Sequence, residues 1–596
     1  MSNVLMQEKS GNTCDINNLD YLDEYAHKNA EVSSLVFMGG RKKESLNGRW
    51  NYAIDQYDCC LNQHWWQEKS VSEEGFTLPQ DYSFDSWPVM NLPCSWNMES
   101  EKLFLYESPM LFTRTFSFKK KANERVFLRI GAANYACRVF LNRNYIGAHF
   151  GGSTPFMFDV TETISETNRI LLVVDATRRP DQVPMYNTDW FNYGGVYRDI
   201  DLVRVPDQYI KDFKVSLVPD GTFNKISVSV KMSTPITSEA RFVIDELAIN
   251  ELIPIKNGYG NIVINSKPIL WSPENPKLYN ISIATETDSV SDLVGFREIT
   301  IVNHDIIING KKVFLRGISC HEDDVERGKA FTEADCIKIM TDAKELGCNF
   351  MRLAHYPHTE MMSKTADRLG IMLWEEIPVY WHIQFNRPET YHTAENMLLE
   401  LITRDYNRAS VIIWSVGNEN PDTESRLSFM RRLAETARDN DNTRKIGAAC
   451  LVSNDNVIAD RLAEYLDVIG INEYIGWYDP DFSKLPELFE KSKPSKPVII
   501  TEVGAGAMPG HHGSNTDKFT EEYQEYVYER QISEIRKIPY IKGMTPWILY
   551  DFRCPRRTNA LQDYYNRKGL ISPNREHKKR AFYTLQKFYN EIASEY

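Results

Sequence analysis

The second half of the chain, from residue 301 to residue 596, has a repeating rhythm that few folds can accommodate. Apolar runs as long as buried strands alternate there with longer segments whose apolar residues recur at helical spacing. The eight apolar runs are Val313–Ser319, Phe350–His355, Ile371–Pro378, Val411–Gly417, Lys445–Cys450, Asp467–Tyr474, Pro497–Gly504 and Gly543–Phe552. The helical segments include Glu333–Leu346, Glu395–Asn407, Arg426–Asn440, Glu521–Ile538 and Arg575–Ser594. Eight such units in about 290 residues predict a (β/α)8 TIM barrel with a helix after each strand.

A doubly wound open sheet is the main alternative for this half, because it also alternates strands with helices. Such sheets commonly carry a glycine-rich phosphate loop after their first strand. No loop of that composition follows Val313–Ser319. The barrel is therefore the preferred prediction.

The first half of the chain has the pattern of two all-β domains. Residues 45–206 contain short strand-like runs separated by turn signals such as Gly151–Gly152, a spacing that predicts an antiparallel β-sandwich. Residues 207–300 contain further alternating runs and have the size of an immunoglobulin-like β-sandwich. With residues 1–44 as an N-terminal extension and residues 301–596 as the barrel, the chain is predicted to be a multidomain β plus α/β protein.

Charge and composition exclude several classes of function. The net charge is −13 and no long basic block is present, which argues against a nucleic-acid partner. No apolar stretch approaches 18 residues and no secretory signal is visible, so neither a membrane span nor export is expected. The ten cysteines form no CxxC pair, a pattern typical of free thiols in the cytoplasm. We therefore expect a cytoplasmic protein without a membrane partner.

Two of the predicted barrel strands end in a glutamate. The fourth run leads into Glu419 and the seventh contains Glu502. Chemistry in TIM barrels gathers at the carboxyl ends of the strands, where a buried carboxylate is costly unless it is paired or used. Either glutamate alone is as readily explained by a structural role. Two carboxyl groups facing each other across a barrel mouth suit glycoside hydrolysis, in which one gives a proton and the other attacks the sugar.

Other side chains at the predicted strand ends suit a sugar site. His355, Asn418, Tyr474 and Trp547 offer hydrogen bonds to hydroxyl groups and a flat stacking surface. The acidic segment His321-Glu322-Asp323-Asp324 has no second histidine at helical spacing. It is interpreted as a polar loop at the edge of the site, and no metal ligands are predicted.

Several longer motifs resemble those of glycoside hydrolase family 2, and the resemblance covers nearly the whole chain. In the barrel the matching segments are Gly417-Asn418-Glu419 with the preceding Asn407-Arg408 and Trp414, and Asn349 through Arg352 to His355-Tyr356-Pro357. Outside it they are Pro93-Cys94-Ser95-Trp96-Asn97, Asn192-Tyr193-Gly194-Gly195-Val196-Tyr197-Arg198, Trp271-Ser272-Pro273 and Gly295-Phe296-Arg297-Glu298. These resemble the jelly-roll and linker landmarks of the family, which implies that residues 45–206 are a jelly-roll sugar-binding-like domain.

The resemblance implies a retaining mechanism by double displacement, with Glu419 as acid/base and Glu502 as nucleophile. Asn418 would donate to the sugar 2-hydroxyl, and Tyr474 would hold the nucleophile. The other implied substrate-binding residues are Asp189, His355, Asn472, Tyr478 and Trp547. No cofactor is required by such a mechanism. Homo-oligomers are common in the family, so an oligomer of identical subunits is among the expected states.

The segment Tyr565-Asn566-Arg567-Lys568-Gly569 resembles the Asn-x-Lys motif of β-glucuronidases. An amide donor and an ammonium two residues apart can bind one carboxylate, so Asn566 and Lys568 are predicted to recognise a β-linked glucuronic acid on small-molecule conjugates. Many β-glucuronidases carry an arginine four residues before this asparagine, where the chain has Gln562, and the nearby Arg553, Arg556 and Arg557 could supply the charge instead. A β-galacturonidase or β-galactosidase on the same scaffold is the alternative. A carbohydrate-binding protein without catalytic activity is a remote one.

Overall fold

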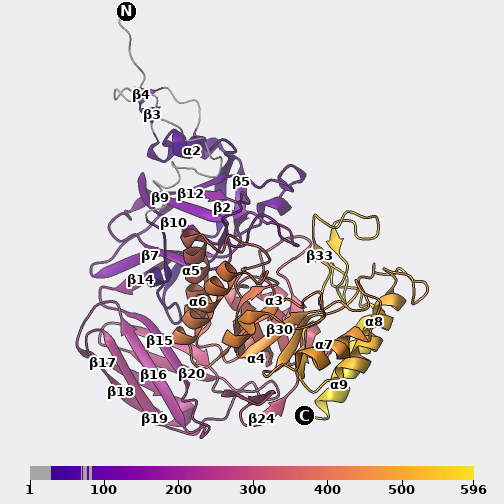
Figure 1. The fold of residues 1–596 in the computed structure, drawn as a ribbon. Helices are drawn as coiled ribbons and strands as arrows, with labels where there is room; N and C mark the ends of the chain where they lie inside the picture. Colours follow the sequence, from indigo (N-terminus) through magenta and orange to yellow (C-terminus); the bar gives the residue numbers. More distant parts are fainter. Residues whose placement is uncertain (1–27, 69, 72–76, 79–82) are drawn as a thin grey trace, which may run out of the picture.

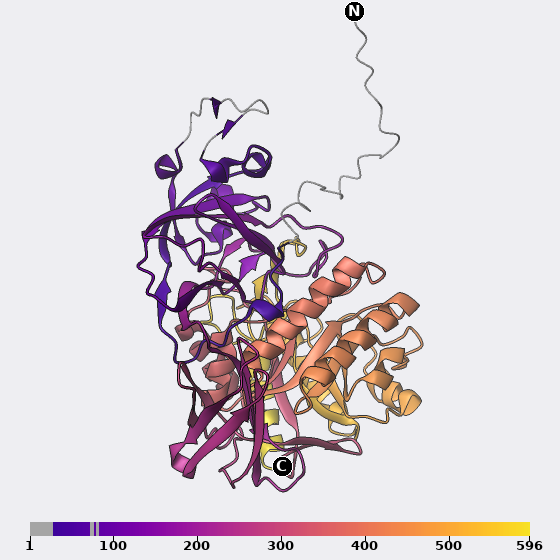
Figure 2. The same ribbon diagram turned by 90° about the vertical axis from the view of Figure 1, so that its left-hand side faces the viewer.

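The computed structural model describes residues 28–68, 70–71, 77–78 and 83–596, which form three domains (Figure 1). The jelly roll and the immunoglobulin-like sandwich lie along one side of the barrel (Figures 1 and 2). The predicted fold class is confirmed. Among the described helices none is long and apolar enough to cross a membrane.

The jelly roll consists of two packed sheets. One has the strand order β1-β14-β7-β11 and the other the order β10-β9-β12-β6-β2-β5. The strands are β1 (Lys43–Ser45), β2 (Gly48–Ile54), β5 (Val89–Leu92), β6 (Met110–Ser117), β7 (Glu124–Ile130), β9 (Ala136–Leu141), β10 (Asn144–Phe150), β11 (Phe156–Asp159), β12 (Thr167–Asp175) and β14 (Ile200–Pro206). Asn142 and Arg143 have φ angles of 50° and 68°, which form the tight turn between β9 and β10.

The immunoglobulin-like sandwich packs a sheet of order β15-β16-β19 against one of order β18-β17-β20-β21. Its strands are β15 (Ile210–Leu217), β16 (Lys225–Met232), β17 (Ser238–Ile244), β18 (Ile249–Ile255), β19 (Tyr259–Asn265), β20 (Tyr279–Ala284) and β21 (Ser289–Val294). In β16 the alternate residues Ile226, Val228 and Val230 are buried, as expected for a strand with one face in the core.

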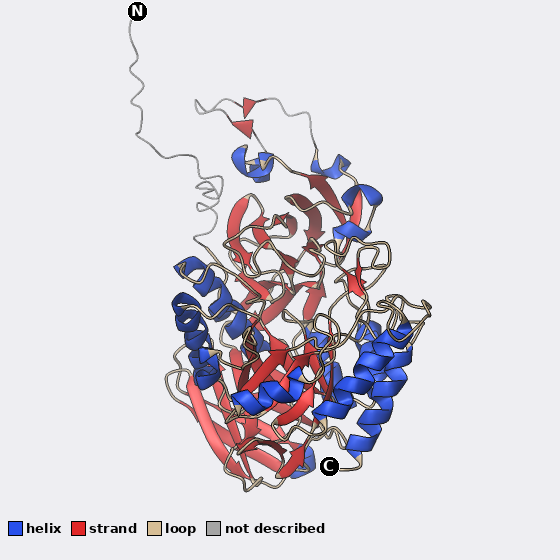
Figure 3. Ribbon diagram, turned by 45° about the vertical axis from the view of Figure 1, so that its right-hand side comes forward, coloured by secondary structure: helices blue, strands red, loops and turns tan. Residues whose placement is uncertain are grey.

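The barrel closes where its eighth strand pairs with its first. All strands are parallel, and helices surround them (Figure 3). The strands are β25 (Leu315–Cys320), β26 (Phe350–Leu353), β27 (Met372–Glu376), β28 (Val411–Asn418), β29 (Lys445–Cys450), β30 (Val468–Asn472), β31 (Val498–Glu502) and β32 (Ile541–Met544). The helices are α3 (Glu333–Glu345), α4 (Glu360–Leu369), α5 (Pro388–Asp405), α6 (Glu424–Asn440), α7 (Lys484–Ser492), α8 (Glu521–Ile535) and α9 (Arg580–Ala593). Every residue of β28 is buried, which explains its uninterrupted apolar run.

Two details of the predicted barrel are wrong. The connection after β29 contains no α-helix, only the 3-10 helix η7 (Arg461–Tyr465), because Asp460 caps this short turn while also pairing with Arg426 of α6. The eighth strand ends at Met544 rather than near Phe552, since Pro546 has no N–H to continue the strand hydrogen bonds. Trp547 therefore lies in the loop after the strand.

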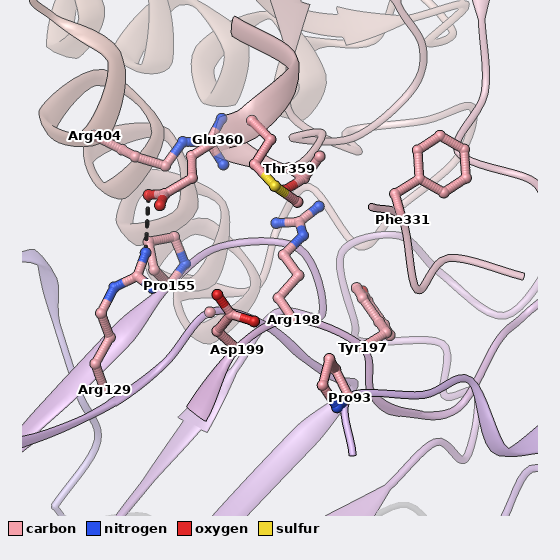
Figure 4. A pocket seen from close by; sticks show the side chains of 12 residues that line it. Pro93, Arg129, Pro155, Tyr197, Arg198, Asp199, Phe331, Thr359, Glu360 and Arg404 are labelled. Atoms are coloured by element: carbon pink, nitrogen blue, oxygen red, sulfur yellow. Dashed lines mark hydrogen bonds and ion pairs between the residues drawn. The ribbon is translucent and has the colours of Figure 1, made fainter. Parts of the chain in front are cut away.

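The jelly roll is fixed to the mouth of the barrel by buried arginines. Arg198 donates to Glu322, in the loop after β25, at 3.0 Å and to the carbonyl of Pro357 at 2.9 Å. A pocket between the two domains is bordered by Arg198 and Arg404, and the ion pair between Arg129 and Glu360 spans it at 2.9 Å (Figure 4). These contacts hold the loop that precedes Arg198 over the barrel mouth.

Candidate active site

The two glutamates lie at the carboxyl end of the barrel. Glu502 is the last residue of β31, and Glu419 directly follows β28. Glu502 is only 5% exposed, whereas Glu419 is half-buried. The negative charge of Glu419 raises the pKa of Glu502, so the two carboxyl groups are within electrostatic reach of each other.

Glu502 is held by two donors. The Arg352 guanidinium donates to Oε1 at 3.0 Å, and the Tyr474 hydroxyl donates to Oε2 at 2.5 Å. Burial raises the pKa of Glu502 to about 7, and these two donors oppose that rise because they stabilise the anion. The carboxyl group is therefore ionised above about pH 7 and takes up a proton as the pH falls through this value.

Glu419 is positioned by the loop that follows β27. The Trp381 indole N–H donates to Oε2 of Glu419 at 2.7 Å, and the Trp381 backbone N–H donates to the carbonyl of Asn418 at 2.9 Å. Glu419 has a φ of 51°, a left-handed conformation that costs about 1–3 kcal/mol in a residue other than glycine. Its backbone N–H donates to Ala449 at 2.8 Å, which anchors this bend to the neighbouring strand.

Arg352 is the centre of the network between the two glutamates. Its side chain is fully buried and also donates to Glu376 at 3.1 Å and to Oδ1 of Asn418 at 2.7 Å. One guanidinium thus fixes a residue on each side of the site, and its charge offsets those of Glu376 and Glu502.

The amide of Asn418 has one end occupied and one end free. Its oxygen accepts from Arg352 and, at 3.1 Å, from Asn472. Its nitrogen is buried and, among the described residues, has no hydrogen-bond partner. Asn472 in turn accepts from the Thr501 hydroxyl at 2.7 Å, so both ends of its amide bond to protein. Asn418 has a donor left for a ligand, and Asn472 holds Asn418 in place.

Aromatic side chains form one wall of the site. The rings of His355 and Trp547 stack with centroids 4.8 Å apart, and Trp190 of the jelly roll lies 5.5 Å from His355. Burial lowers the pKa of His355 to about 4, although Glu376 at 2.8 Å favours the charged form. The imidazole is therefore neutral at neutral pH.

A buried cation lies at the other end of the site. Lys568 is 4% exposed, and its Nζ lies 5.0–5.5 Å from the ring centroids of Tyr474, Trp477 and Tyr478. The Nζ also donates to the Tyr478 hydroxyl at 3.3 Å. Within the described part of the chain, no carboxylate lies within ion-pair distance of this ammonium. Because Tyr474 contacts both Lys568 and Glu502, the cation and the glutamates belong to one site.

Asp189 and Asn566 lie beside Lys568. Asn566 ends the short strand β34 (Tyr565–Asn566), which pairs with β33 (Phe552–Arg553), and its amide nitrogen donates to Asp189 at 3.3 Å. Asp189 also accepts from Arg557 at 2.5 Å. The structure thus brings all the sequence-predicted site residues into one connected region: Asp189, His355, Asn418, Glu419, Asn472, Tyr474, Tyr478, Glu502, Trp547, Asn566 and Lys568.

Three further residues of the site were not selected from the sequence: Arg352, Glu376 and Trp381. Arg557 was considered only as one of three arginines that could supply a charge near Gln562. Arg352 and Glu376 stand at the ends of predicted strands two and three, and that position was the available signal. Trp381 and Arg557 lie in loops, where no periodic pattern marks an inward-facing side chain.

The acidic segment after β25 serves the domain junction. Glu322 pairs with Arg198, and Asp323 pairs with Arg553 at 3.3 Å. Among the residues that the structure describes, no group of three or more histidine, cysteine or acidic side chains is arranged to hold a metal ion.

Comparisons with known proteins give matches between residues 43 and 594. Family models described as "Glycosyl hydrolases family 2" match in three parts: the sugar binding domain over residues 43–206, a central domain over 208–297 and the TIM barrel domain over 299–594. A β-glucuronidase of Paenibacillus borealis is 27% identical over 91% of this chain and 96% of its own length.

Two solved structures show the same fold. The β-glucuronidase of Bifidobacterium dentium complexed with coumarin-3-O-glucuronide matches with a TM-score of 0.83 at 24% identity, over 93% of this chain and 98% of its own. The β-galacturonidase of Eisenbergiella tayi bound to galacturonate matches with a TM-score of 0.79 at 23% identity, over 94% of this chain and 99% of its own.

Proposed function

The chain belongs to glycoside hydrolase family 2, and from that premise we propose that it removes terminal β-D-glucuronic acid from small-molecule glucuronide conjugates, with retention of configuration. The β-glucuronidase relatives support this activity, as does the arrangement of the two glutamates. The motif resemblance drawn from the sequence is confirmed by the family matches.

The observation that carries the choice of sugar is the buried Lys568 ammonium. Lys568 is 4% exposed and three aromatic rings surround its ammonium, which has no carboxylate partner among the described residues. Burial of an unpaired charge is energetically costly. A uronic acid supplies the missing negative charge, and the Asn566 amide two residues away adds a neutral donor. A neutral hexose supplies no charge and leaves the ammonium unpaired.

The proposed reaction has two halves. Glu502 attacks the anomeric carbon while Glu419 gives its proton to the departing oxygen, which forms a covalent glycosyl-enzyme and releases the aglycone. In the second half a water molecule attacks the anomeric carbon while Glu419 takes its proton. This attack breaks the bond between the sugar and Glu502 and releases glucuronic acid. These steps need no metal or organic cofactor.

The neighbours of the glutamates support this division of roles. Arg352 and Tyr474 both donate to Glu502, which favours the anion that a nucleophile needs. The free amide nitrogen of Asn418 is placed to donate to the sugar 2-hydroxyl, a contact that strengthens in the transition state. The stacked pair of His355 and Trp547 provides a flat wall for the sugar ring.

A β-galacturonidase is the second candidate. Galacturonic acid carries the same carboxylate and differs at C4, and a β-galacturonidase is among the similar folds. Lys568 and Asn566 serve either uronic acid equally well. The same residues disfavour a β-galactosidase, and the complete network around both glutamates disfavours a protein that only binds carbohydrate.

The test compares Lys568→Met with the unchanged protein on p-nitrophenyl β-D-glucuronide, galacturonide and galactoside. Methionine keeps the length of the side chain and removes the charge. Loss of a charge-assisted hydrogen bond of about 1.5–3 kcal/mol should lower kcat/KM for both uronides by about 10- to 150-fold. Galactoside hydrolysis should not fall.

The unchanged protein must prefer the glucuronide among the three substrates. A preference for the galacturonide would change the proposed substrate to a galacturonic acid conjugate and leave the proposed mechanism unchanged. Equal loss on all three substrates in Lys568→Met would refute the carboxylate-binding role of this lysine.

A further inference from the structure

A second cation meets Lys568 at the Tyr478 hydroxyl. Desolvation of this phenol would raise its pKa, yet the pKa is lowered, because the charges of Lys568 and Arg557 outweigh that effect and both side chains hydrogen-bond to the phenol. The Nζ of Lys568 lies 3.3 Å from the phenolic oxygen, and the charge of Arg557 acts on the same group. Two like charges close together repel each other, and a bound anion would offset that repulsion.

Arg557 has donors to spare in this position. One edge of its guanidinium donates to Asp189 at 2.5 Å. Its Nε is buried and, within the described chain, has no hydrogen-bond partner. A guanidinium presents its N–H groups as a planar fork that matches a carboxylate, so an unpartnered donor on a fixed arginine points to a bound anion.

Gln562 takes no part in this cluster. Its side-chain oxygen accepts from Asn559 at 2.6 Å, and its carbonyl accepts from Arg567 at 3.1 Å, within the loop that leads to β34. The side chain of Gln562 carries no charge, and its hydrogen bond lies within its own loop. The second positive charge at this end of the site comes instead from five residues earlier in the chain.

We propose that Arg557 is the second cation of the uronate subsite: it binds the substrate carboxylate together with Lys568, and Asp189 fixes its guanidinium in place. The proposal rests on the proposed function, because it presupposes a uronic acid in the site. Arg557 at 2.5 Å and Arg556 at 3.9 Å both pair with Asp189, so these two cations and Lys568 outnumber the one negative charge of Asp189, and a bound carboxylate reduces the imbalance. Arg557 is thus a specificity-determining residue.

The experiment measures the ratio of kcat/KM for p-nitrophenyl β-D-glucuronide to kcat/KM for the matching glucoside. Arg557→Gln should lower this ratio by about 10- to 100-fold, mainly through the glucuronide. Arg557→Lys keeps the charge and loses the fork, so its ratio should fall between those of the unchanged protein and Arg557→Gln. Inhibition by free D-glucuronate should weaken in the same order, which gives a second readout where turnover is low.

Two controls separate the carboxylate contact from general effects. Gln562→Ala should leave the ratio within about twofold, because that side chain bonds only within its loop. Arg438→Gln removes the same charge from α6, where Arg438 pairs with Asp467 at 3.1 Å, and should change the ratio by less than about threefold.

The outcomes distinguish the two proposals. If Lys568→Met abolishes the preference for the glucuronide and Arg557→Gln does not change it, the role of Arg557 is refuted and the proposed function stands. An equal fall on both substrates in Arg557→Gln would also refute it, since that is the result of lost positioning alone. If the unchanged protein hydrolyses no uronide, the proposal falls together with the proposed function.

Discussion

The pKa of Glu502 leads to a pH dependence that two single substitutions should move in opposite directions. Burial and the charge of Glu419 raise this pKa to about 7, and Arg352 and Tyr474 oppose the rise. A nucleophile must be ionised, so for a substrate whose leaving group needs no proton, kcat/KM should fall as the pH drops below about 7 and level off above it. The acidic limb of the profile reports Glu502 in the free enzyme.

Glu419→Gln removes one of the two causes that raise the pKa. Carboxyl groups of retaining enzymes are about 5–5.5 Å apart, and at an effective dielectric constant of about 20 their repulsion is about 3 kcal/mol. That energy corresponds to about two pKa units. The acidic limb of Glu419→Gln should therefore move from about pH 7 to about pH 5.

The assay uses 2,4-dinitrophenyl β-D-glucuronide from pH 4 to pH 9. This leaving group departs without a proton, so the first chemical step of Glu419→Gln remains measurable. The initial burst of dinitrophenolate is followed by stopped flow, because the variant lacks the base for the second step. The apparent pKa of the acidic limb is compared between the variant and the unchanged protein.

Tyr474→Phe provides the opposing variant. The Tyr474 hydroxyl donates to Glu502 at 2.5 Å and stabilises the anion, so its removal should move the acidic limb to higher pH. If both variants shift the limb in the same direction, or if Glu419→Gln leaves it near pH 7, the assignment of Glu502 as the titrating nucleophile is refuted.

Two further substitutions test the remaining roles. Glu419→Ala should slow the hydrolysis of phenyl glucuronides with poor leaving groups by at least about 100-fold, because these leaving groups need a proton. Release of dinitrophenolate needs no proton and should be spared. An equal loss across a series of leaving groups would exclude the acid role. Asn418→Ala should lower kcat/KM for a glucuronide by about 10²–10³-fold, because the amide nitrogen of Asn418 donates to the 2-hydroxyl. The 2-deoxy analogue lacks this hydroxyl, so its kcat/KM should fall by less than about tenfold. Equal losses on the two substrates would contradict the 2-hydroxyl contact.

The fold was predictable because burial leaves a strong mark on the sequence. A barrel strand such as β28 is covered on both faces, and its apolar run shows this directly. The connection after β29 was not predictable in the same way. A short 3-10 turn replaces the expected helix there, and Asp460, which caps this turn, pairs with Arg426 of another element. The end of β32 was mistaken because the apolar residues beyond Pro546 are buried in a loop rather than in a strand.

The site was predictable at the strand ends and less so in the loops. Glu419 and Glu502 stand where barrel strands finish, and the (β/α)8 pattern alone places such residues at one mouth. Trp381 reaches Glu419 only because the loop after β27 pairs with the end of β28, a contact between segments 38 residues apart. Arg557 reaches Asp189 across two domains and 368 residues. Contacts of that kind are set by the tertiary fold and have no local signature.

The two ends of the site are linked through a single side chain. The Tyr474 ring lies 5.0 Å from the Lys568 ammonium, and its hydroxyl donates to Glu502. A bound uronate brings another negative charge towards Glu502, and without compensation that charge would favour protonated Glu502. Lys568 and Arg557 balance the uronate at one end, while Arg352 stabilises Glu502 at the other. The cations that select the substrate thus also keep the nucleophile ionised once the substrate is bound.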